Sequence, residues 1–171
     1  MPIEIREATS EDAELIAKIH VLSWQAAYAD IIPGPFLENL SVAARTQGWR
    51  KSLEAGRLRV LLAYVEQAAV GWIAFGASRD ADKDGTWAEV EALYILPAAW
   101  GQGVGKCLSD AARHILEAAG YANVMLWVLS ENQRARAFYQ HIGFVCDESS
   151  KAIEIGGAPL IETRYGCALR G

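Results

Sequence analysis

The sequence predicts a single α/β domain that is built on a mixed sheet. Segments in which apolar and polar residues alternate, as they do in strands, recur between segments whose apolar residues follow the helical repeat. A length of 171 residues is typical of one domain, and no repeat or linker divides residues 1–171. The expected order is one strand, two helices, three strands, one helix, one strand, one helix and two strands.

The first strand and the first helix are marked by alternation and by a capping signature. Residues 3–7 alternate as in a short strand, and Thr9 stands three residues before Asp12, which predicts the start of a helix. The stripe of this helix that is expected to pack on the core consists of Leu15, Ile19, Leu22 and Ala26. A second stripe, too far around the helix for one core to cover both easily, consists of His20, Trp24 and Tyr28.

A break in the chain separates the two N-terminal helices. The Pro-Gly-Pro run at residues 33–35 interrupts the chain, and Ser41 is the expected N-cap of a helix that ends near Gly56. The period then changes to that of strands and predicts an antiparallel hairpin. The expected strands of this hairpin span residues 58–65 and 70–77, with a turn around residues 66–67. A solvated loop is expected to follow at residues 78–85.

Strands and helices alternate over the second half of the chain. The expected strands span residues 86–96, 124–129, 144–147 and 162–169, and the expected helices span residues 101–119 and 131–141. The first of these helices should face inward with Val104, Leu108, Ala111 and Ile115. Gly156 and Gly157 mark the turn between the last two strands.

Composition excludes several classes of protein. Apolar residues make up 52% of the chain and charged residues 22%, with a mean hydropathy of +0.09, which excludes a disordered or collagen-like chain. The net charge of −5 argues against nucleic acid as a partner. Without a leader pattern or a long apolar run, we expect a cytoplasmic protein with no membrane partner. The three cysteines are expected to be reduced, buried thiols, and no spacing predicts a metal site.

Residues 99–106 form a glycine-rich segment between a predicted strand and a predicted helix. The unpaired amides and the dipole at a helix N-terminus favour an anion, and glycines allow the backbone to approach a phosphate closely. The spacing of Gly101, Gly103 and Gly105 matches neither the dinucleotide-binding fingerprint nor the P-loop. The alternative interpretation is a turn that only packs closely against its neighbours.

Four motifs resemble, in order and spacing, those of the GNAT family of N-acetyltransferases. They are Glu89-Val-Glu-Ala-Leu-Tyr-Ile-Leu-Pro97, Trp100-Gly-Gln-Gly-Val-Gly105, Asn132-Gln-Arg-Ala-Arg-Ala-Phe-Tyr139 and His141-Ile-Gly-Phe144. The flanking elements fit the family order over nearly the whole chain. The resemblance implies the GNAT fold, which is a mixed, mostly antiparallel central sheet flanked by helices, and transfer of an acetyl group from acetyl-CoA to an amine.

The resemblance also implies which residues bind acetyl-CoA. Leu93, Tyr94 and Ile95 would pair with pantetheine through their main chain, and Asn132 would bond the cofactor arm, although it also suits a simple N-cap. The diphosphate would be held by Gly101, Gln102, Gly103, Val104, Gly105 and Lys106. Trp100 departs from the family, which most often has Arg or Gln there. Lys106 would replace that cation only if it pointed inward.

The chemistry needs an acid for the departing thiolate and a base for the ammonium group of the acceptor. By resemblance, Tyr139 is the general acid. By resemblance, Glu89 occupies a position at which several family members have a glutamate that acts as the general base, directly or through water. Glu91 is the alternative base, because alternation along the strand places both glutamates on one face with Leu93 and Ile95. Some family members have a catalytic glutamate five residues before the asparagine that corresponds to Asn132, but this chain has Trp127 at that position.

The acceptor itself is not identified by the sequence. Resemblance places Trp24 and Tyr28 over the acceptor side, where ring faces would hold an alkyl or cationic amine beside Glu89. His20 is an alternative base, and aromatic packing without acceptor contact is an alternative role for the stripe. A non-catalytic acyl-CoA-binding module and a protein N-terminal or lysine acetyltransferase are the competing functions, and the sequence does not separate a monomer from a homodimer.

Overall fold

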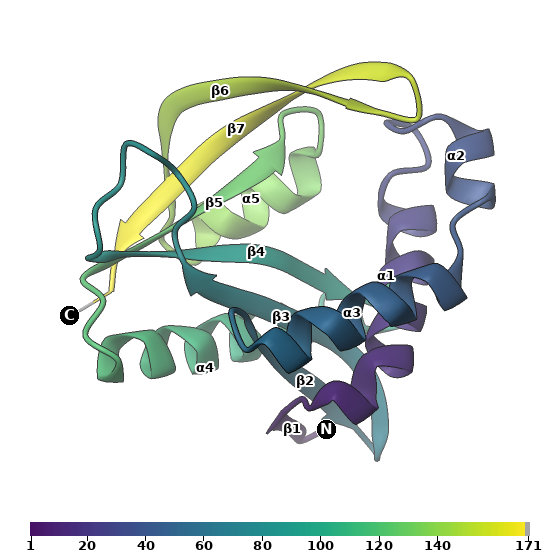
Figure 1. The fold of residues 1–171 in the computed structure, drawn as a ribbon, viewed down its shortest axis with the longest axis horizontal. Coiled ribbons are helices and arrows are strands. Elements are labelled where there is room, and N and C mark those ends of the chain that lie inside the picture. The colour runs from purple at the N-terminus through teal and green to yellow at the C-terminus, as the bar shows by residue number, and fades with distance from the viewer. Residues whose placement is uncertain (170–171) are drawn as a thin grey trace.

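The computed structural model describes residues 1–169, which form a seven-stranded sheet with helices on both faces (Figure 1). The strands lie in the order β1-β2-β3-β4-β5-β7-β6, and only the β4–β5 pair is parallel. The strands are β1 (Ile3–Glu7), β2 (Arg59–Val65), β3 (Ala68–Ala77), β4 (Trp87–Ile95), β5 (Asn123–Leu129), β6 (Val145–Ile155) and β7 (Ala158–Ala168). The helices are α1 (Ala13–Ala27), α2 (Gly34–Glu38), α3 (Val42–Ala55), α4 (Val104–Ala118) and α5 (Gln133–His141). This arrangement confirms the predicted mixed, mostly antiparallel sheet.

The parallel pair of strands separates soon after it begins. β4 pairs with β5 only where Trp87–Glu89 meets Asn123–Met125, so the rest of β4 has one edge without a strand neighbour in the described chain. Figure 1 shows the two strands diverging from their common start. The separation opens the middle of the sheet and leaves backbone amides and carbonyls of β4 available on that edge.

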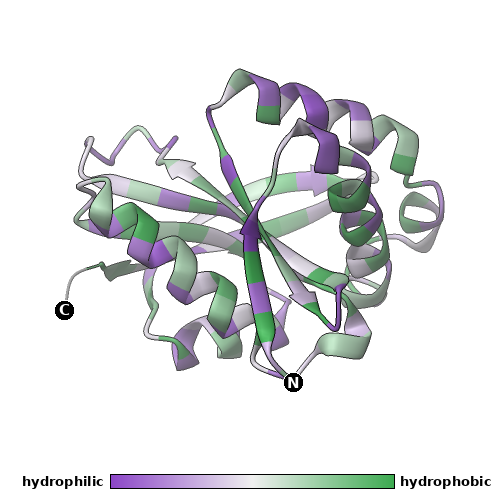
Figure 2. Ribbon diagram, turned by 90° about the horizontal axis from the view of Figure 1, so that it is seen from below, coloured by the Kyte–Doolittle hydropathy of each residue, from purple (hydrophilic) through white to green (hydrophobic). Residues whose placement is uncertain are grey.

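Each face of the sheet has its own core. Buried residues that include Leu61, Phe75, Leu108 and Leu126 pack between the sheet and α4. A second cluster, which includes Ile16, Val60, Leu62 and Trp72, packs between the sheet and the layer of α1 and α3. Hydrophobic and hydrophilic residues alternate along β1, so one face of this strand can pack on the core (Figure 2).

The buried surface of α1 differs from the predicted stripe. Leu15 and Ile19 of that stripe pack on the core as predicted, but Leu22 is 53% exposed and Ala26 is exposed. Ile16, His20 and Ser23 are buried instead. The reason is that α1 lies between the sheet and α3, so two sides of the helix are covered instead of one. The aromatic stripe that begins at His20 is therefore part of a buried cluster.

Several turns and caps follow the sequence signals. Thr9 and Asp12 form the predicted capping box, with Asp12 Oδ2 accepting from the Thr9 amide at 2.8 Å. Ser41 caps α3, and Gly56 ends it in the left-handed conformation. The Pro-Gly-Pro break contains the short helix α2, which the sequence analysis did not predict.

The C-terminal hairpin is longer than predicted. β6 and β7 have 11 residues each, and the turn lies at Gly156-Gly157 as expected. The hairpin tip reaches α2 (Figure 1), where a Cβ atom on Gly156 would lie 2.7 Å from the Cβ of Phe36. Leu129, Leu160, Ile32 and Leu37 form the apolar cluster beneath this contact. The hairpin therefore spans the opened sheet and joins the helical layer.

The predicted solvated loop, residues 78–85, is tied to the C-terminal hairpin through two of its carboxylates. The buried Arg164 of β7 donates to Asp80 at 2.8 Å and to Asp82 at 2.9 Å, and to Asp147 of β6 at 2.6 Å. The buried guanidinium is thus surrounded by three carboxylates, which satisfies its charge. Only the outer part of this loop is solvated as predicted.

Three further predictions concern absences and thiols. No helix within residues 1–169 is long and apolar enough to cross a membrane. The same residues contain no group of three acidic, histidine or cysteine side chains placed to hold a metal ion. Cys107, Cys146 and Cys167 are free thiols, and they are half-buried, not fully buried as predicted.

Candidate functional site

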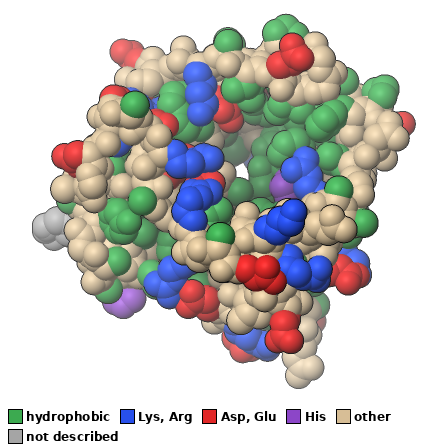
Figure 3. Space-filling view, viewed as in Figure 1, with side chains coloured by type: hydrophobic (Ala, Val, Ile, Leu, Met, Phe, Trp, Pro, Cys, Tyr) green, Lys and Arg blue, Asp and Glu red, His purple; other side chains and the backbone are tan. Residues whose placement is uncertain are grey.

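A cleft of about 520 Å³ occupies the space between β4 and β5. Its walls come from α1, β4, the glycine loop (residues 99–106), β5 and α5, and the hairpin contributes Ile155 and Glu162. Figure 3 shows a hollow in the middle of this face, lined by hydrophobic side chains, with lysine and arginine side chains around it. One cleft therefore brings together most of the residues that the sequence singled out.

The glycine loop presents backbone at the start of α4. Gly101 and Gly103 have φ angles of +75° and +84°, a region that side-chain-bearing residues rarely adopt, and both are exposed. The helix begins at Val104, three residues later than predicted, because these two left-handed residues lie outside it. A Cβ atom on Gly101 or Gly103 would meet no atom within 4 Å, and amides at a helix N-terminus favour an anion.

Gly105 has a different role from its two neighbours. A Cβ atom at this position would lie 2.9 Å from Cζ of Phe138. The lack of a side chain at Gly105 therefore lets α4 approach α5, so this glycine serves the packing of the cleft wall.

The open edge of β4 forms the wall next to the loop. Leu93, Tyr94 and Ile95 all line the cleft, as expected for residues that pair with an extended ligand. The carbonyl of Ile95, however, accepts a 2.8 Å hydrogen bond from the indole of Trp100 and one of 3.4 Å from Ser23 Oγ. A ligand that used this carbonyl would have to share or displace the Trp100 bond.

The cation at the loop comes from α5. Lys106 borders the cleft, but it is exposed and its amino group pairs with Asp110 at 2.6 Å along the helix surface. Arg134 instead lines the cleft, with its guanidinium carbon 3.5 Å from the ring centroid of Trp100. Partial burial of the guanidinium lowers the pKa of Arg134, although the residue as a whole is exposed. The sequence analysis did not single out Arg134.

Asn132 and Tyr139 lie at the two ends of α5. Asn132 is buried, and its Oδ1 accepts from the Ala135 amide at 3.2 Å as the N-cap while the residue lines the cleft. Tyr139 packs edge-on against Phe138 and Phe144, and it also lines the cleft. Burial is the main cause that raises the pKa of Tyr139, so its phenol holds its proton at neutral pH.

Glu89 and Glu91 do not lie on the strand face predicted for them. β4 has a bulge at Glu91, because Ala74 is opposite Ala92 while Phe75 is opposite Val90. The bulge reverses the alternation, so Leu93 and Ile95 pack on the α4 side together with Val90. The prediction that the two glutamates share one strand face with Leu93 and Ile95 is therefore wrong.

Both glutamates are bound to arginines. Glu89 is 1% exposed, and its carboxylate accepts from the amide of Arg79 at 3.0 Å and from its guanidinium at 2.7 Å. Glu91 lines the cleft and accepts from Arg57 at 2.6 Å, with Arg79 Nε at 3.3 Å. Glu89 does not line the cleft, so only one of these two carboxylates faces it.

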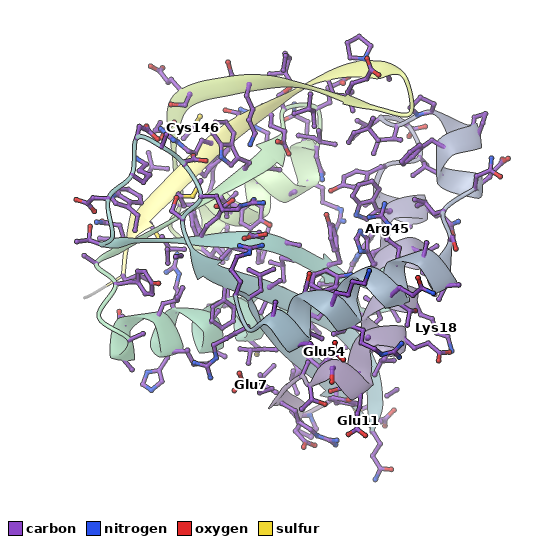
Figure 4. All side chains as sticks on the ribbon, viewed as in Figure 1. Glu7, Glu11, Lys18, Arg45, Glu54 and Cys146 are labelled. Carbon is purple, nitrogen blue, oxygen red and sulfur yellow. The ribbon has the colours of Figure 1, made fainter. Side chains whose placement is uncertain are left out.

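Aromatic side chains of α1 and β4 form a further part of the cleft wall, which is called the aromatic end below. Trp24 and Tyr28 line it as predicted, with ring centroids 5.1 Å apart, and Tyr94 lies 6.2 Å from Trp24. Burial raises the pKa of the Tyr28 phenol. The guanidinium carbon of Arg45 is 5.5 Å from the Trp24 ring centroid, and Figure 4 shows Arg45 beside the central hollow. This end suits an apolar or cationic group.

His20 is enclosed by the aromatic cluster. Its Nδ1 accepts from Trp49 Nε1 at 3.2 Å, and its ring stacks on Tyr94 with centroids 5.3 Å apart. Burial, with a smaller contribution from the charge of Arg45, lowers the pKa of His20 to about 4. The residue is therefore neutral at pH 7 and does not line the cleft.

Glu162 is a cleft carboxylate that the sequence analysis did not single out. It lies on β7 opposite Leu129 of β5 and lines the cleft. Its nearest ionic partner is Lys151 Nζ at 3.7 Å. The sequence signal for Glu162 was an acidic residue in a strand, between Ile161 and Thr163. Because the predicted strand began at residue 162, the face on which Glu162 lies was not assigned.

Comparison with known proteins agrees with this arrangement. The model of the acetyltransferase (GNAT) family matches residues 20–144. The uncharacterized N-acetyltransferase YuaI of Bacillus subtilis is 32% identical over 139 residues, which cover 81% of this chain and 78% of that protein. A spermidine N(1)-acetyltransferase of Thermoplasma acidophilum is 26% identical over 176 residues, which cover 96% of this chain and 99% of the relative.

A solved structure shows the same fold. The PaiA N-acetyltransferase of Thermoplasma acidophilum, in complex with coenzyme A, superposes with a TM-score of 0.70 at 24% identity, covering 95% of this chain and 98% of its own. The family match spans the glycine loop, the open edge of β4 and α5, which are three of the walls of the cleft described above. The chain belongs to the acetyltransferase (GNAT) family.

Proposed function

We propose that this chain transfers the acetyl group of acetyl-CoA to a primary amine of a small molecule or peptide. The observation that carries the proposal is that an open strand edge, a helix N-terminus with free amides and a protonated phenol share one cleft. An extended thioester with a diphosphate needs the first two features, and a departing thiolate needs the third. The family to which the chain belongs supports the same activity.

The proposed binding mode of acetyl-CoA follows the cleft from end to end. The diphosphate would lie at the amides of residues 101–106, with Arg134 as the neighbouring cation. Pantetheine would pair with the edge of β4 at Leu93 and Tyr94, next to Asn132. This mode places the thioester toward Tyr139 and the aromatic end. The coenzyme A complex of the PaiA relative supports the choice of cofactor.

The proposed reaction is direct attack of the amine on the thioester carbonyl. Tyr139 would donate its proton to the sulfur as the carbon–sulfur bond breaks, because a phenol protonated at pH 7 is a suitable donor for a thiolate. Glu89 and Glu91 were the expected bases. Of the two, only Glu91 lines the cleft. Its ion pairs with Arg57 and Arg79 would also shape the entrance for the acceptor.

The acceptor would bind at the aromatic end beside Trp24 and Tyr28. An alkylammonium suits ring faces and a nearby carboxylate. The name of the spermidine N(1)-acetyltransferase relative supports an amine of this type without identifying it.

The test is an assay of free CoA release with acetyl-CoA and a panel of polyamines, aminoglycosides, amino acids and short peptides. We expect release to depend on at least one amine, with mass spectrometry showing one acetyl group on that acceptor. Acetyl-CoA binding without release for every amine would indicate a non-catalytic acyl-CoA-binding module. Acetylation of peptides alone would indicate a protein acetyltransferase.

A further inference from the structure

We propose that Glu162 is the base that removes the proton from the acceptor ammonium group. This inference rests on the proposed function, since it concerns the acceptor end of the same cleft. It replaces neither Tyr139 nor the cofactor-binding residues, and it adds a residue from β7 to a site otherwise built from α1, β4, β5 and α5.

The position of Glu162 is set by the hairpin. β7 pairs with β5 so that Glu162 lies opposite Leu129, three residues before Asn132. The hairpin tip is held against α2 by the contact of Gly156 with Phe36. With both ends of this part of the hairpin fixed, the Glu162 side chain faces the cleft and is only 22% exposed.

Glu162 is also the cleft carboxylate best able to take a proton. Of the residues within 1–169 that line the cleft, Glu91 and Glu162 are the carboxylates. Glu91 is held by Arg57 through two hydrogen bonds, of 2.6 and 3.3 Å, so both of its carboxylate oxygens already have a partner. Glu162 has only a 3.7 Å contact with Lys151, which is beyond hydrogen-bond distance.

The surroundings of Glu162 make its carboxylate more basic than an exposed one. Burial raises the pKa of its carboxyl, against the lowering effects of Lys151 and Arg79, and the charge of Glu89 raises it further. Burial is the main cause that raises the pKa of Tyr28 and Tyr94, and the charge of Glu162 makes a smaller contribution in the same direction. Lys151 also lies 4.3 Å from the ring centroid of Trp127, which holds its ammonium group beside the strand.

The proton transfers balance as follows. The Glu162 carboxylate takes one proton from the acceptor ammonium, and the neutral nitrogen forms a bond with the thioester carbon. When the carbon–sulfur bond breaks, the thiolate takes the Tyr139 proton, and the second proton lost by the nitrogen restores the phenol through water. Glu162 then releases its proton to solvent, which leaves an amide, free CoA and one proton.

The experiment compares pH profiles of kcat/KM for the unchanged chain, Glu162→Gln and Lys151→Met. The probe is acetyl-CoA with the alkylamine of the panel that is acetylated fastest, beginning with spermidine. Glu154→Gln is the matched control, since Glu154 is an exposed carboxylate on the same hairpin. Acetyl-CoA affinity and the unfolding midpoint are measured for each variant, so that a folding defect is recognised.

We expect Glu162→Gln to lower kcat/KM by roughly 10²-fold at pH 7 and to remove the titration of the carboxyl from the profile, so that kcat/KM of the variant follows only the fraction of neutral amine. The loss should shrink as the pH rises and the free amine becomes neutral. Lys151→Met should move the acidic decline to higher pH, because removal of a positive neighbour raises the pKa of the carboxyl. A folded Glu162→Gln variant with the parental profile, or a Lys151→Met profile that does not move, would overturn the inference.

The failure of the inference differs from the failure of the proposed function. If the unchanged chain acetylates an amine and Glu162→Gln loses the same factor at every pH, Glu162 positions the acceptor and is not the base. If the unchanged chain acetylates no amine of the panel, the proposed function itself is wrong, and the role of Glu162 in it falls as well.

Discussion

The guanidinium group of Arg134 rests on the indole ring of Trp100, with 3.5 Å between the guanidinium carbon and the ring centroid. The contact joins α5 to the glycine loop across the cleft, and the same indole donates to the Ile95 carbonyl on β4. Trp100, which replaces the cation usual at this position in the family, thus holds a cation from another element close to the expected diphosphate.

Replacing Arg134 by Gln should weaken acetyl-CoA binding about tenfold, because a charge-assisted hydrogen bond to a phosphate contributes on the order of 1.5–3 kcal/mol. Isothermal titration calorimetry measures the dissociation constant. Lys106→Gln is the control and should change it little, since Lys106 pairs with Asp110. If Lys106→Gln has the larger effect, the diphosphate lies on the outer side of the loop.

Gly103→Val should lower acetyl-CoA affinity by at least about tenfold. A branched side chain at a φ angle of +84° strains the loop and obstructs the approach of the backbone to a phosphate. Gly105→Ala is the contrasting variant, and its added methyl group meets Phe138 at 2.9 Å. It should lower the unfolding midpoint through the α4–α5 contact. Unchanged affinity in Gly103→Val would mean that the loop is not the phosphate site.

The arginine-bound glutamates should respond differently from a free base. Because Glu89 is buried beneath Arg79, we expect Glu89→Gln to reduce the free energy of unfolding by about 2 kcal/mol while the acidic decline of kcat/KM is kept. Glu91→Gln should mainly raise KM for the acceptor. Chemical denaturation and pH profiles of both variants provide the measurements. A flattened profile in either variant would restore the sequence-based assignment of that glutamate as the base.

The buried His20 should make the fold sensitive to mild acid. Its pKa is lowered from 6.5 to about 4 in the folded chain, so its neutral form stabilises the fold fully above pH 6.5. This contribution, about 3 kcal/mol, is lost as the pH falls toward 4, because the unfolded chain binds the proton more readily. Denaturation of the unchanged chain and of His20→Phe at pH 7 and pH 4.5 tests this. Equal losses in both chains would show that His20 does not titrate as described.

Local signals predicted most of the fold and the cofactor side of the site. The capping box at Thr9, the Gly56 terminus and the Gly156-Gly157 turn each depend on a few neighbouring residues, so they can be read from the sequence. The glycine loop, Asn132 and Tyr139 were found through spaced motifs, and the structure places them in one cleft.

The remaining features depend on contacts between distant segments. The bulge at Glu91 interrupts an otherwise regular alternation, and nothing in the strand sequence marks it. The burial of His20 follows from α3 covering a second side of α1 through Trp49. Arg134 and Glu162 enter the cleft because α5 and β7 lie where tertiary packing puts them, which a search for local motifs does not reveal.

The central claim is that the cleft performs acetyl transfer with Tyr139 as the proton donor, and Tyr139→Phe tests it most directly. The change keeps the ring packing against Phe138 and Phe144 and removes only the hydroxyl group. The measurement is kcat for an acetylated amine together with the acetyl-CoA dissociation constant of the same variant. We predict that kcat falls by roughly 10²-fold or more, equivalent to about 2.7 kcal/mol of transition-state stabilisation, while the dissociation constant stays nearly unchanged. A folded variant that turns over at the parental rate would contradict the claim.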